Sequence, residues 1–131
     1  VGITRGTTQN HIIRAAEESI AYQSADLVAA MEKDTGVPIT SLKVDGGASR
    51  DQFLMQFQAD CLRVPINCSD VEEASALGAV VMNGMARKIW TSFEQVSVLR
   101  RSRYRIEPQS NLSQVEKWCE GWLKAVNQLI R

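Results

Sequence analysis

The sequence predicts an α/β fold in which short parallel strands alternate with amphipathic helices. Three observations predict it: stretches with helical periodicity, short apolar runs between them, and a Gly-Gly turn that joins one such run directly to a helix. The chain has 131 residues, 44% of them hydrophobic, which suits one domain or part of one. Two central strands are too few to cover all the expected helices. We therefore expect the later part of a larger domain, or a sheet completed by a partner.

The first helix is expected over residues 11–33, because apolar side chains recur there at helical spacing. Thr8 or Asn10 would cap its N-terminus by accepting a hydrogen bond from an unpaired backbone N–H. Gly36 would end the helix in a left-handed conformation, and Pro38 would prevent its continuation.

Extended segments are expected at residues 1–4, 41–45 and 64–67, which carry β-branched or other apolar side chains. Pro65 cannot donate a hydrogen bond to a neighbouring strand. Its position predicts that residues 64–67 lie at a sheet edge or are paired on one side there. Residues 93–106 are expected to be extended or irregular.

Three further helices follow from periodicity and capping signals. Residues 50–62 place their apolar side chains on one side of a helix. Ser69 and Glu72 have the spacing of a capping box, which would open a helix that runs to about residue 86. Residues 111–130 carry an apolar stripe and form the last expected helix.

Composition and charge argue against several classes of function. Lys plus Arg is 15 and Asp plus Glu is 15, a balance that is untypical of a nucleic-acid-binding module. No apolar run approaches the ~18 residues that a membrane span needs. Cys61, Cys68 and Cys119 form no CxxC pair, so we expect a reducing, cytoplasmic location and no disulfide framework. No nucleophile–base pair is visible, and we predict no catalytic residue and no metal ligand in this chain.

The turn at Gly46 and Gly47 is the most informative candidate for a binding site. It follows the strand expected at residues 41–45, and ligands of open α/β sheets bind beyond the carboxyl ends of strands. Because glycine has no side chain, a flat or phosphorylated ligand could touch the backbone there. The pattern alone leaves a second interpretation open, in which the glycines serve only the geometry of the turn.

Two other clusters also have two interpretations. Residues 4–8, with His11 and Arg14, combine hydroxyl groups and cations that suit phosphate, but a helix cap and a solvated helix face are more usual. The basic run at residues 100–105 could bind a polyanion, although a strand edge guarded by charge is commoner. Its cationic side chains are Arg100, Arg101, Arg103 and Arg105.

Several longer strings of the sequence carry a resemblance to a known family. They are residues 2–8, 11–15, 20–23, 44–48, 53–60 and 76–79, followed by Gly84, Trp90 and Trp122. These strings resemble the later part of the glycerol kinases, within the carbohydrate-kinase family named for its Phe-Gly-Gly-Tyr sequence. The resemblance covers nearly the whole chain.

This resemblance implies an actin-like, ribonuclease-H-like ATPase fold with two domains around a cleft. It also implies transfer of the γ-phosphoryl group of ATP, with Mg²⁺, to a hydroxyl of glycerol or a related polyol. Residues 1–131 would then be the C-terminal part of the second, nucleotide-binding domain. The first domain, with the polyol pocket and the catalytic aspartate, would lie outside this chain, so the segment alone would be inactive.

By the same resemblance, Gly46, Gly47 and Ala48 would contact the adenine nucleotide. Asp51 stands where the family has an Asn that contacts nucleotide, and its carboxylate can accept a hydrogen bond but cannot donate one. Lys88 stands where Gly is more usual.

Two alternatives remain beside a glycerol kinase. One is another sugar kinase of the same family, such as a pentulose kinase. The other is a non-catalytic actin-like module that binds nucleotide or another protein. In each case we expect a homo-oligomer, formed through an open sheet edge or an apolar helix face.

Overall fold

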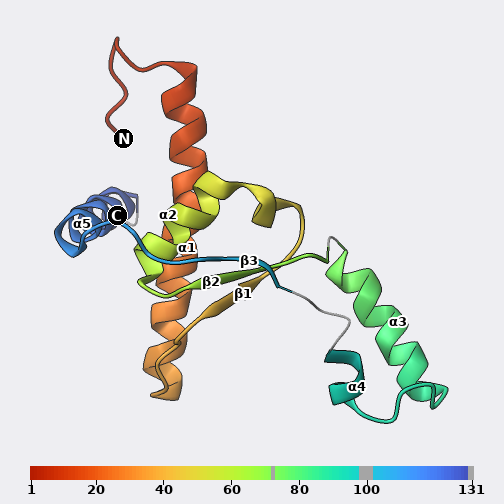
Figure 1. The fold of residues 1–131 in the computed structure, drawn as a ribbon. Coiled ribbons are helices and arrows are strands. Elements are labelled where there is room, and N and C mark those ends of the chain that lie inside the picture. The colour runs from red at the N-terminus through yellow and green to blue at the C-terminus, as the bar shows by residue number, and fades with distance from the viewer. Residues whose placement is uncertain (72, 98–101, 130–131) are drawn as a thin grey trace.

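The structure is a computed structural model that describes residues 1–71, 73–97 and 102–129. Helices and strands alternate along the chain, as the sequence predicts (Figure 1). In chain order the elements are α1 (Gln9–Thr35), β1 (Leu42–Val44), the 3-10 turn η1 (Gly47–Arg50), α2 (Gln52–Leu62), β2 (Ile66–Ser69), α3 (Ala74–Ala86), α4 (Phe93–Ser97), β3 (Ser102–Ile106) and α5 (Leu112–Asn127).

The described strands form one sheet in the order β1-β2-β3. β1 and β2 are parallel, with Leu42 beside Ile66 and Val44 beside Cys68, which confirms the predicted parallel pairing. β3 joins antiparallel to β2, so β2 is the central strand and the edge position expected for it is wrong. Pro65 causes no conflict because it lies one residue before β2. Its carbonyl oxygen accepts a hydrogen bond of 2.9 Å from the N–H of Leu42 on the β1 side.

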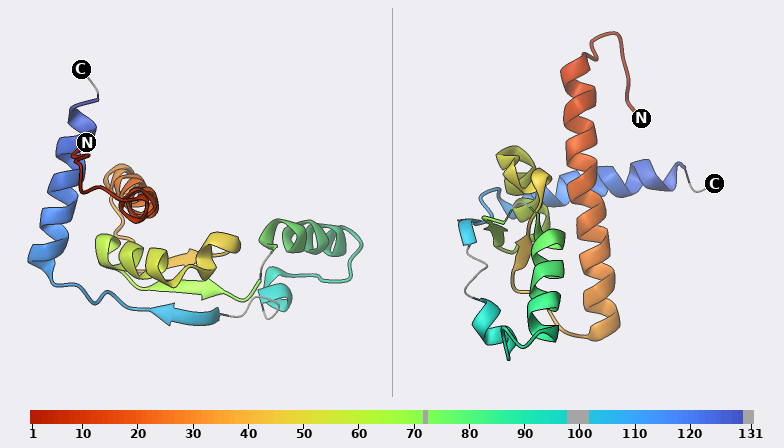
Figure 2. Two further views of the ribbon diagram at one scale, coloured as in Figure 1. Left: turned by 90° about the horizontal axis from the view of Figure 1, so that it is seen from above. Right: turned by 90° about the vertical axis from the view of Figure 1, so that its right-hand side faces the viewer.

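The core lies between the sheet and α2, with α1 packed on the far side of α2 (Figure 2). Its buried members come from α1, α2 and β2 and are Ala21, Leu54, Met55, Phe57, Ala59, Cys61, Ile66 and Cys68. α5 lies beside α1 and α2, whereas α3 and α4 extend past the end of β2 (Figures 1 and 2). The arrangement leaves the carboxyl ends of β1 and β2 facing α3.

α1 is two residues longer at each end than the predicted 11–33, and the predicted flanking residues Thr8 and Gly36 are confirmed. Thr8 is the N-cap, and Gly36 ends the helix at φ 66° with its N–H bonded to the carbonyl of Glu32 at 2.8 Å. Residues 1–4, expected as a strand, form none, because no described strand pairs with them. Although α1 spans 27 residues, neither it nor another helix in the described ranges combines the length and apolarity needed to cross a membrane.

Two helices begin later than their patterns suggest. α2 starts at Gln52 instead of Arg50, because residues 47–50 form the separate turn η1. The capping box expected at Ser69 is wrong, since Ser69 is the last residue of β2 and α3 begins only at Ala74. The Ser69 hydroxyl accepts a hydrogen bond of 3.1 Å from the N–H of Val71. Glu72, the other half of that prediction, lies outside the described residues.

The segment expected to be extended or irregular divides into two parts. Residues 102–106 pair with β2 as β3, but Phe93–Ser97 forms the helix α4, contrary to the expectation. The side chain of Gln95 accepts a hydrogen bond of 2.9 Å from the N–H of Thr91, and Val96 is buried. Both interactions favour a helical turn over an extended segment.

Lys88 occupies a position whose backbone conformation favours glycine. It has φ 59°, a left-handed conformation that costs a residue with a side chain about 1 kcal/mol. Its N–H bonds to the carbonyl of Met85 at 3.0 Å, and the N–H of Ile89 bonds to Gly84 at 2.8 Å. These two hydrogen bonds form the standard left-handed termination of a helix.

The buried Gly84 allows the indole of Trp90 to fold back against α3. A Cβ atom at residue 84 would overlap the Cζ3 and Cε3 atoms of Trp90. We expect Gly84→Ala to lower the free energy of unfolding by about 2 kcal/mol, measured by urea denaturation. Gly78→Ala is the matched control in the same helix, because nothing lies within 4 Å of its Cβ position. That variant should gain up to about 1 kcal/mol, and equal losses in both variants would contradict the packing argument.

Candidate functional site

The carboxyl ends of β1 and β2 meet at one edge of the sheet, because these strands are parallel. Asp45 follows β1 directly and leads into the Gly-Gly turn, and Asp70 follows β2. The turn therefore lies where the sequence placed it, at the strand end that forms ligand sites in open α/β sheets.

Gly46 makes the turn possible through its backbone conformation. It has φ 84° and ψ 179°, a region that is essentially restricted to glycine. Its carbonyl oxygen accepts two hydrogen bonds from Ser49, 3.2 Å from the N–H and 2.7 Å from the hydroxyl. The geometry of the turn is therefore enough to account for glycine at position 46.

Gly47 differs from Gly46, because nothing in the described fold requires it to be glycine. It is the first residue of η1, and it is absent from the residues with positive φ. An ideal Cβ atom at this position would meet no atom within 4 Å. The backbone of Gly47 is therefore open to a ligand that approaches closely.

Ala48 and Asp51 form the connection from η1 to α2. The carbonyl oxygen of Ala48 accepts a hydrogen bond of 3.1 Å from the N–H of Asp51. Asp51 is the N-cap of α2, and its Oδ1 accepts a hydrogen bond of 3.0 Å from the N–H of Leu54. The sequence analysis missed this capping role, although an Asp directly before an apolar helical run is a usual signal for it.

Tyr104 of β3 holds the turn through a hydrogen bond. Its hydroxyl donates a hydrogen bond of 2.6 Å to the carbonyl oxygen of the buried Ser49. It also faces Cys68, whose pKa is raised by burial and lowered in part by a hydrogen bond with Tyr104. Sequence analysis did not single out Tyr104, because the contact depends on how β3 pairs with β2.

A cavity of about 360 Å³ adjoins the turn. It is bounded by the strand ends at Asp45 and Ser69, by Val71, and by α3 and α4. The α3 wall is formed by Ala74, Leu77, Gly78 and Val81. The edge of the sheet thus combines an exposed backbone turn with a largely apolar cavity, which suits a flat ring system carrying a polar group. Within residues 1–71, 73–97 and 102–129, no three His, Cys, Asp or Glu side chains are grouped as metal ligands.

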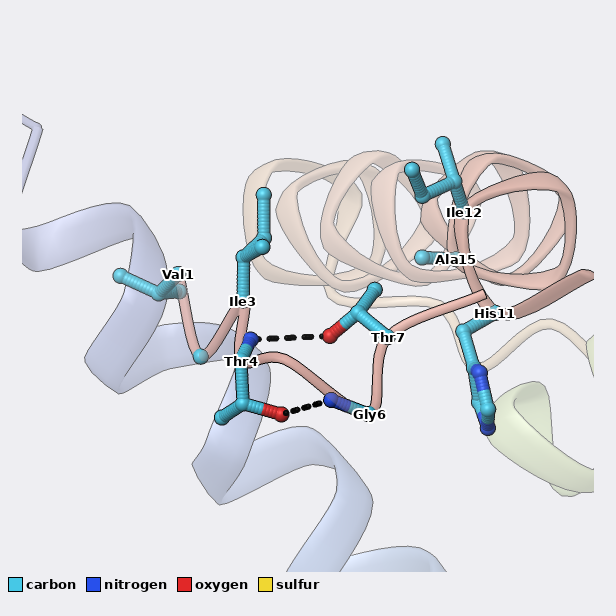
Figure 3. Close-up of a pocket in the computed structure, with 9 residues that line it drawn as sticks. Val1, Ile3, Thr4, Gly6, Thr7, His11, Ile12 and Ala15 are labelled. Carbon is cyan, nitrogen blue, oxygen red and sulfur yellow. Dashed lines mark hydrogen bonds between the residues drawn. The ribbon is translucent and has the colours of Figure 1, made fainter. Parts of the chain in front are cut away.

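A second cavity, of about 520 Å³, lies between residues 1–7 and the start of α1 (Figure 3). The hydroxyl of Thr7 accepts a hydrogen bond of 2.9 Å from the N–H of Thr4, and that of Thr4 accepts one of 3.3 Å from Gly6. Thr8 bonds to Nδ1 of His11 through its N–H at 3.1 Å and its hydroxyl at 2.8 Å. The hydroxyl groups of this cluster therefore stabilise the start of α1, which agrees with the capping interpretation.

Two of the cationic candidates, Arg14 and Arg105, are paired with acidic side chains. Nε of Arg14 lies 2.7 Å from Glu18, and its guanidinium lies 4.8 Å from the ring centre of Phe53. Nε of Arg105 lies 2.6 Å from Glu107. Arg100 and Arg101 lie outside the described residues, as does the side chain of Arg103. Of the arginine run, the structure therefore describes only the side chain of Arg105, which is paired with Glu107.

The chain matches the model of a known protein family. Residues 1–87 match the C-terminal domain of the FGGY family of carbohydrate kinases. The glycerol kinase of Caldanaerobacter subterraneus subsp. tengcongensis is 47% identical over 131 residues, which is 100% of this chain and 26% of that enzyme. The glycerol kinase of Deinococcus radiodurans is 48% identical over 126 residues, 96% of this chain and 25% of that enzyme. The chain thus spans about a quarter of the length of the curated relatives it matches.

Solved structures agree on the fold. Plasmodium falciparum glycerol kinase, determined with ADP, has a TM-score of 0.82 at 35% identity and covers 98% of this chain and 26% of its own. Xylulose kinase from Rhodospirillum rubrum has a TM-score of 0.80 at 21% identity, with the same coverage. These matches confirm the predicted later part of an actin-like, ribonuclease-H-like ATPase domain.

Proposed function

The chain belongs to the FGGY family of carbohydrate kinases, and from that premise we propose that it is part of an ATP-dependent glycerol kinase. In this proposal, residues 1–131 are the C-terminal part of the second, nucleotide-binding domain. The first domain supplies the polyol pocket and the catalytic aspartate. The whole enzyme transfers the γ-phosphoryl group of ATP to a hydroxyl of glycerol, and this segment alone is inactive.

The observation that carries the proposal is the match to glycerol kinases along the entire chain, at 47% identity to the Caldanaerobacter enzyme. The xylulose kinase has the same fold at 21% identity, which supports the fold but not a pentulose acceptor. Each relative named above is a kinase, so the non-catalytic alternative gains no support from them.

Within the enzyme, we assign the Gly-Gly turn to the adenosine part of ATP. The backbone of Gly46, Gly47 and Ala48 would form the binding surface for adenosine. The space above Gly47 is open, and the cavity beside Asp45 adjoins it. Oδ1 of Asp51 is engaged by Leu54. Its Oδ2 would accept a hydrogen bond from a nucleotide hydroxyl. A hydroxyl suits this negatively charged carboxylate better than a phosphate would, because two negative charges repel each other.

Phosphoryl transfer consists mainly of positioning and of neutralising charge. When bound, Mg²⁺ would supply positive charge that offsets the negative charge of the phosphates. The role of this chain would be to hold the nucleotide in place. Residues outside the chain would present the acceptor hydroxyl in line with the γ-phosphorus.

An acceptor assay on the natural-length protein tests the proposal. ADP release should be measured with ATP, Mg²⁺ and either glycerol or xylulose as acceptor. We expect kcat/KM for glycerol to exceed that for xylulose by at least about 100-fold, because sites built to bind specific hydroxyls reject poor matches strongly. A preference for xylulose would support the pentulose alternative. If no ADP is released with either acceptor, the result would support the non-catalytic alternative.

The proposal includes a reducing, cytoplasmic location, which is supported by the three free thiols of Cys61, Cys68 and Cys119. It also includes a homo-oligomer. α1 exposes an apolar stripe whose members, at helical spacing, are 49–58% exposed. They are Ile13, Ile20, Leu27 and Met31.

We expect this stripe to mediate self-association. Leu27→Glu should weaken association at least about tenfold in sedimentation velocity, because a charge would be buried in the contact. Ala29→Glu, at an exposed position of the same helix away from this stripe, serves as the charge-matched control. A monomer at every concentration, or equal effects of both substitutions, would contradict the role of the stripe.

A further inference from the structure

Tyr104 reaches the Gly-Gly turn from a strand that is not paired with the strand before the turn. The turn follows β1, whereas Tyr104 lies on β3, and β2 separates these two strands in the sheet. Val44 of β1 is in register with Cys68 of β2, and Cys68 is in register with Tyr104. Neighbours in register point to the same face of a sheet, so these side chains form a row across it. All three belong to the hydrophobic core or pack against it. Tyr104 therefore lies on the face that α2 covers.

From this position the Tyr104 hydroxyl begins a short chain of hydrogen bonds that ends at Gly46. It donates a bond of 2.6 Å to the carbonyl oxygen of Ser49. The hydroxyl and the N–H of Ser49 in turn donate bonds of 2.7 and 3.2 Å to the carbonyl oxygen of Gly46. Ser49 is only 5% exposed, so little water competes for these bonds. The peptide group between Gly46 and Gly47 is thereby tied to β3 through Ser49.

The peptide group between the two glycines is trans, which makes the direction of its carbonyl important for ligand binding. The C=O and the N–H of a trans peptide group point in opposite directions. The bonds from Ser49 to the Gly46 carbonyl therefore also fix the direction of the Gly47 N–H. That N–H belongs to the backbone that is open to a ligand.

A pair of glycines depends on such a tether more than other residues do. Glycine has no Cβ atom, and its backbone samples more conformations than that of any other residue. A turn that sampled many conformations in the free enzyme would lose this freedom when a ligand bound to its backbone. That loss of entropy would weaken binding, so a turn that is already fixed binds more tightly.

We propose that Tyr104 is a positioning residue for the nucleotide, a role that rests on the proposed function. Its hydroxyl holds the turn, through Ser49, in the conformation that binds adenosine, and it acts without direct contact with ATP. The hydroxyl is the one polar group of this side chain. Tyr104→Phe thus removes the first bond of the chain, while the ring keeps its place in the row across the sheet.

The turn would bind the part of the nucleotide that ATP and ADP share, and this determines the expected kinetics. Loosening the turn should weaken the ground state and the transition state equally, which raises KM and leaves kcat unchanged. We expect Tyr104→Phe to raise KM for ATP and Kd for ADP by the same factor of about five. This factor corresponds to the typical net contribution of one hydrogen bond. KM for glycerol should not change.

A merely structural role of Tyr104 predicts a different pattern. A variant that is only less stable contains fewer folded molecules, so the measured kcat falls while the folded molecules keep their KM for ATP. Ser110→Ala is the matched control, because it also removes one half-buried hydroxyl that donates a bond, of 2.7 Å, to Oδ2 of Asp60. Asp60 lies near the end of α2 that is remote from the turn. We expect Ser110→Ala to unfold at a lower urea concentration with unchanged KM for ATP.

Ser49→Ala tests the second bond of the chain, because it removes the hydroxyl that bonds to the Gly46 carbonyl. It should also raise KM for ATP about fivefold. If Tyr104 acts through Ser49, the two bonds are links of one chain, and the double variant should raise KM by no more than about tenfold. Independent effects would instead multiply to about 25-fold, which would contradict the action through Ser49.

The test uses the natural-length protein, with steady-state kinetics for ATP and calorimetric titration of ADP. Hydrogen exchange adds a measurement that does not depend on activity. The amides of residues 47–51 should exchange about fivefold faster in Tyr104→Phe than in the wild-type protein, because the tether limits opening of the turn. Ser110→Ala should leave their exchange unchanged.

Three results would overturn this inference. They are an unchanged KM for ATP in Tyr104→Phe while Gly47→Asp raises it, a fall in kcat alone, and unchanged exchange at residues 47–51. The first would leave the nucleotide at the turn but show that its binding does not depend on Tyr104. If neither substitution changes KM for ATP, the proposed nucleotide site itself is wrong, and this inference fails with it.

Discussion

Gly47→Asp is expected to raise KM for ATP about 30-fold in the intact kinase while leaving KM for glycerol unchanged. The side chain would occupy the open space above Gly47 and bring a negative charge toward the nucleotide. An effect of this size corresponds to ~2 kcal/mol, a reasonable cost for a partly solvated charge near an anionic ligand. The measurement is steady-state kinetics with each substrate varied at saturation of the other.

The contrast between the two glycines makes this experiment specific. At Gly47 the backbone conformation and the empty surroundings accommodate a side chain, so the substitution should change the free energy of unfolding by less than about 0.5 kcal/mol. At Gly46, with φ 84°, Gly46→Ala should cost about 1–3 kcal/mol of stability through backbone strain. Gly47→Ala should have a smaller effect on KM than Gly47→Asp, because it adds bulk but no charge.

If KM for ATP is unchanged in a folded Gly47→Asp enzyme, the nucleotide does not bind at this turn. A large loss of stability would instead indicate that Gly47 is needed for the fold, and the kinetic result would then say nothing about binding. Urea denaturation of each variant separates the two cases.

The second large effect is expected at Asp60, a buried carboxylate at the C-terminal end of α2. Its Oδ1 accepts hydrogen bonds from the N–H groups of Gln109 at 2.6 Å and Ser110 at 3.1 Å, and from Gln56 Nε2 at 3.2 Å. Its Oδ2 accepts one of 2.7 Å from the Ser110 hydroxyl. Nearby, Arg63 donates a hydrogen bond of 2.7 Å to the carbonyl of Ser110. These bonds anchor the segment that leads from β3 into α5.

We expect Asp60→Ala to lower the free energy of unfolding by about 3 kcal/mol. The substitution leaves two backbone N–H groups of a half-buried loop without their partner, and hydrogen bonds to charged groups are individually strong. Asp60→Asn keeps an acceptor at Oδ1 and should cost only about 1 kcal/mol. Asp51→Ala is the matched control at about 1 kcal/mol, because it removes a carboxylate that accepts a hydrogen bond from Leu54 at the start of the same helix.

The contribution of Asp60 should depend on pH in a defined direction. Burial raises the pKa of Asp60, but the hydrogen bonds from Gln109, Ser110 and Gln56 outweigh it and hold the pKa below its ordinary value. A carboxylate whose pKa is lowered by folding stabilises the protein above its unfolded pKa of about 4, and this stability is lost as pH falls through the folded pKa.

The stability difference between the wild-type protein and Asp60→Asn should therefore be constant above about pH 5 and shrink as the pH falls below about 4. Thermal or urea denaturation across this range measures it. A difference that is independent of pH down to pH 2 would contradict the anchoring role of the ionised carboxylate.

Much of the local structure was determined by the sequence itself. Apolar spacing predicted α1 and α5, and Gly36 predicted the left-handed end of α1. The strand before Gly46 and the turn after it were also predictable, because a pair of glycines at the end of a strand usually marks a turn. These features depend on backbone preferences and on periodicity within a short window, which a sequence displays directly.

Only the tertiary structure decided the features that depend on contacts between distant residues. β2 became central instead of an edge strand because β3 pairs with it, and that pairing also brings Tyr104 to Ser49. The φ angle at position 46 requires glycine, whereas nothing in the described fold requires glycine at position 47. This difference is likewise visible only in three dimensions. Such contacts arise from how whole elements pack, and their free energy is gained only when the chain has folded.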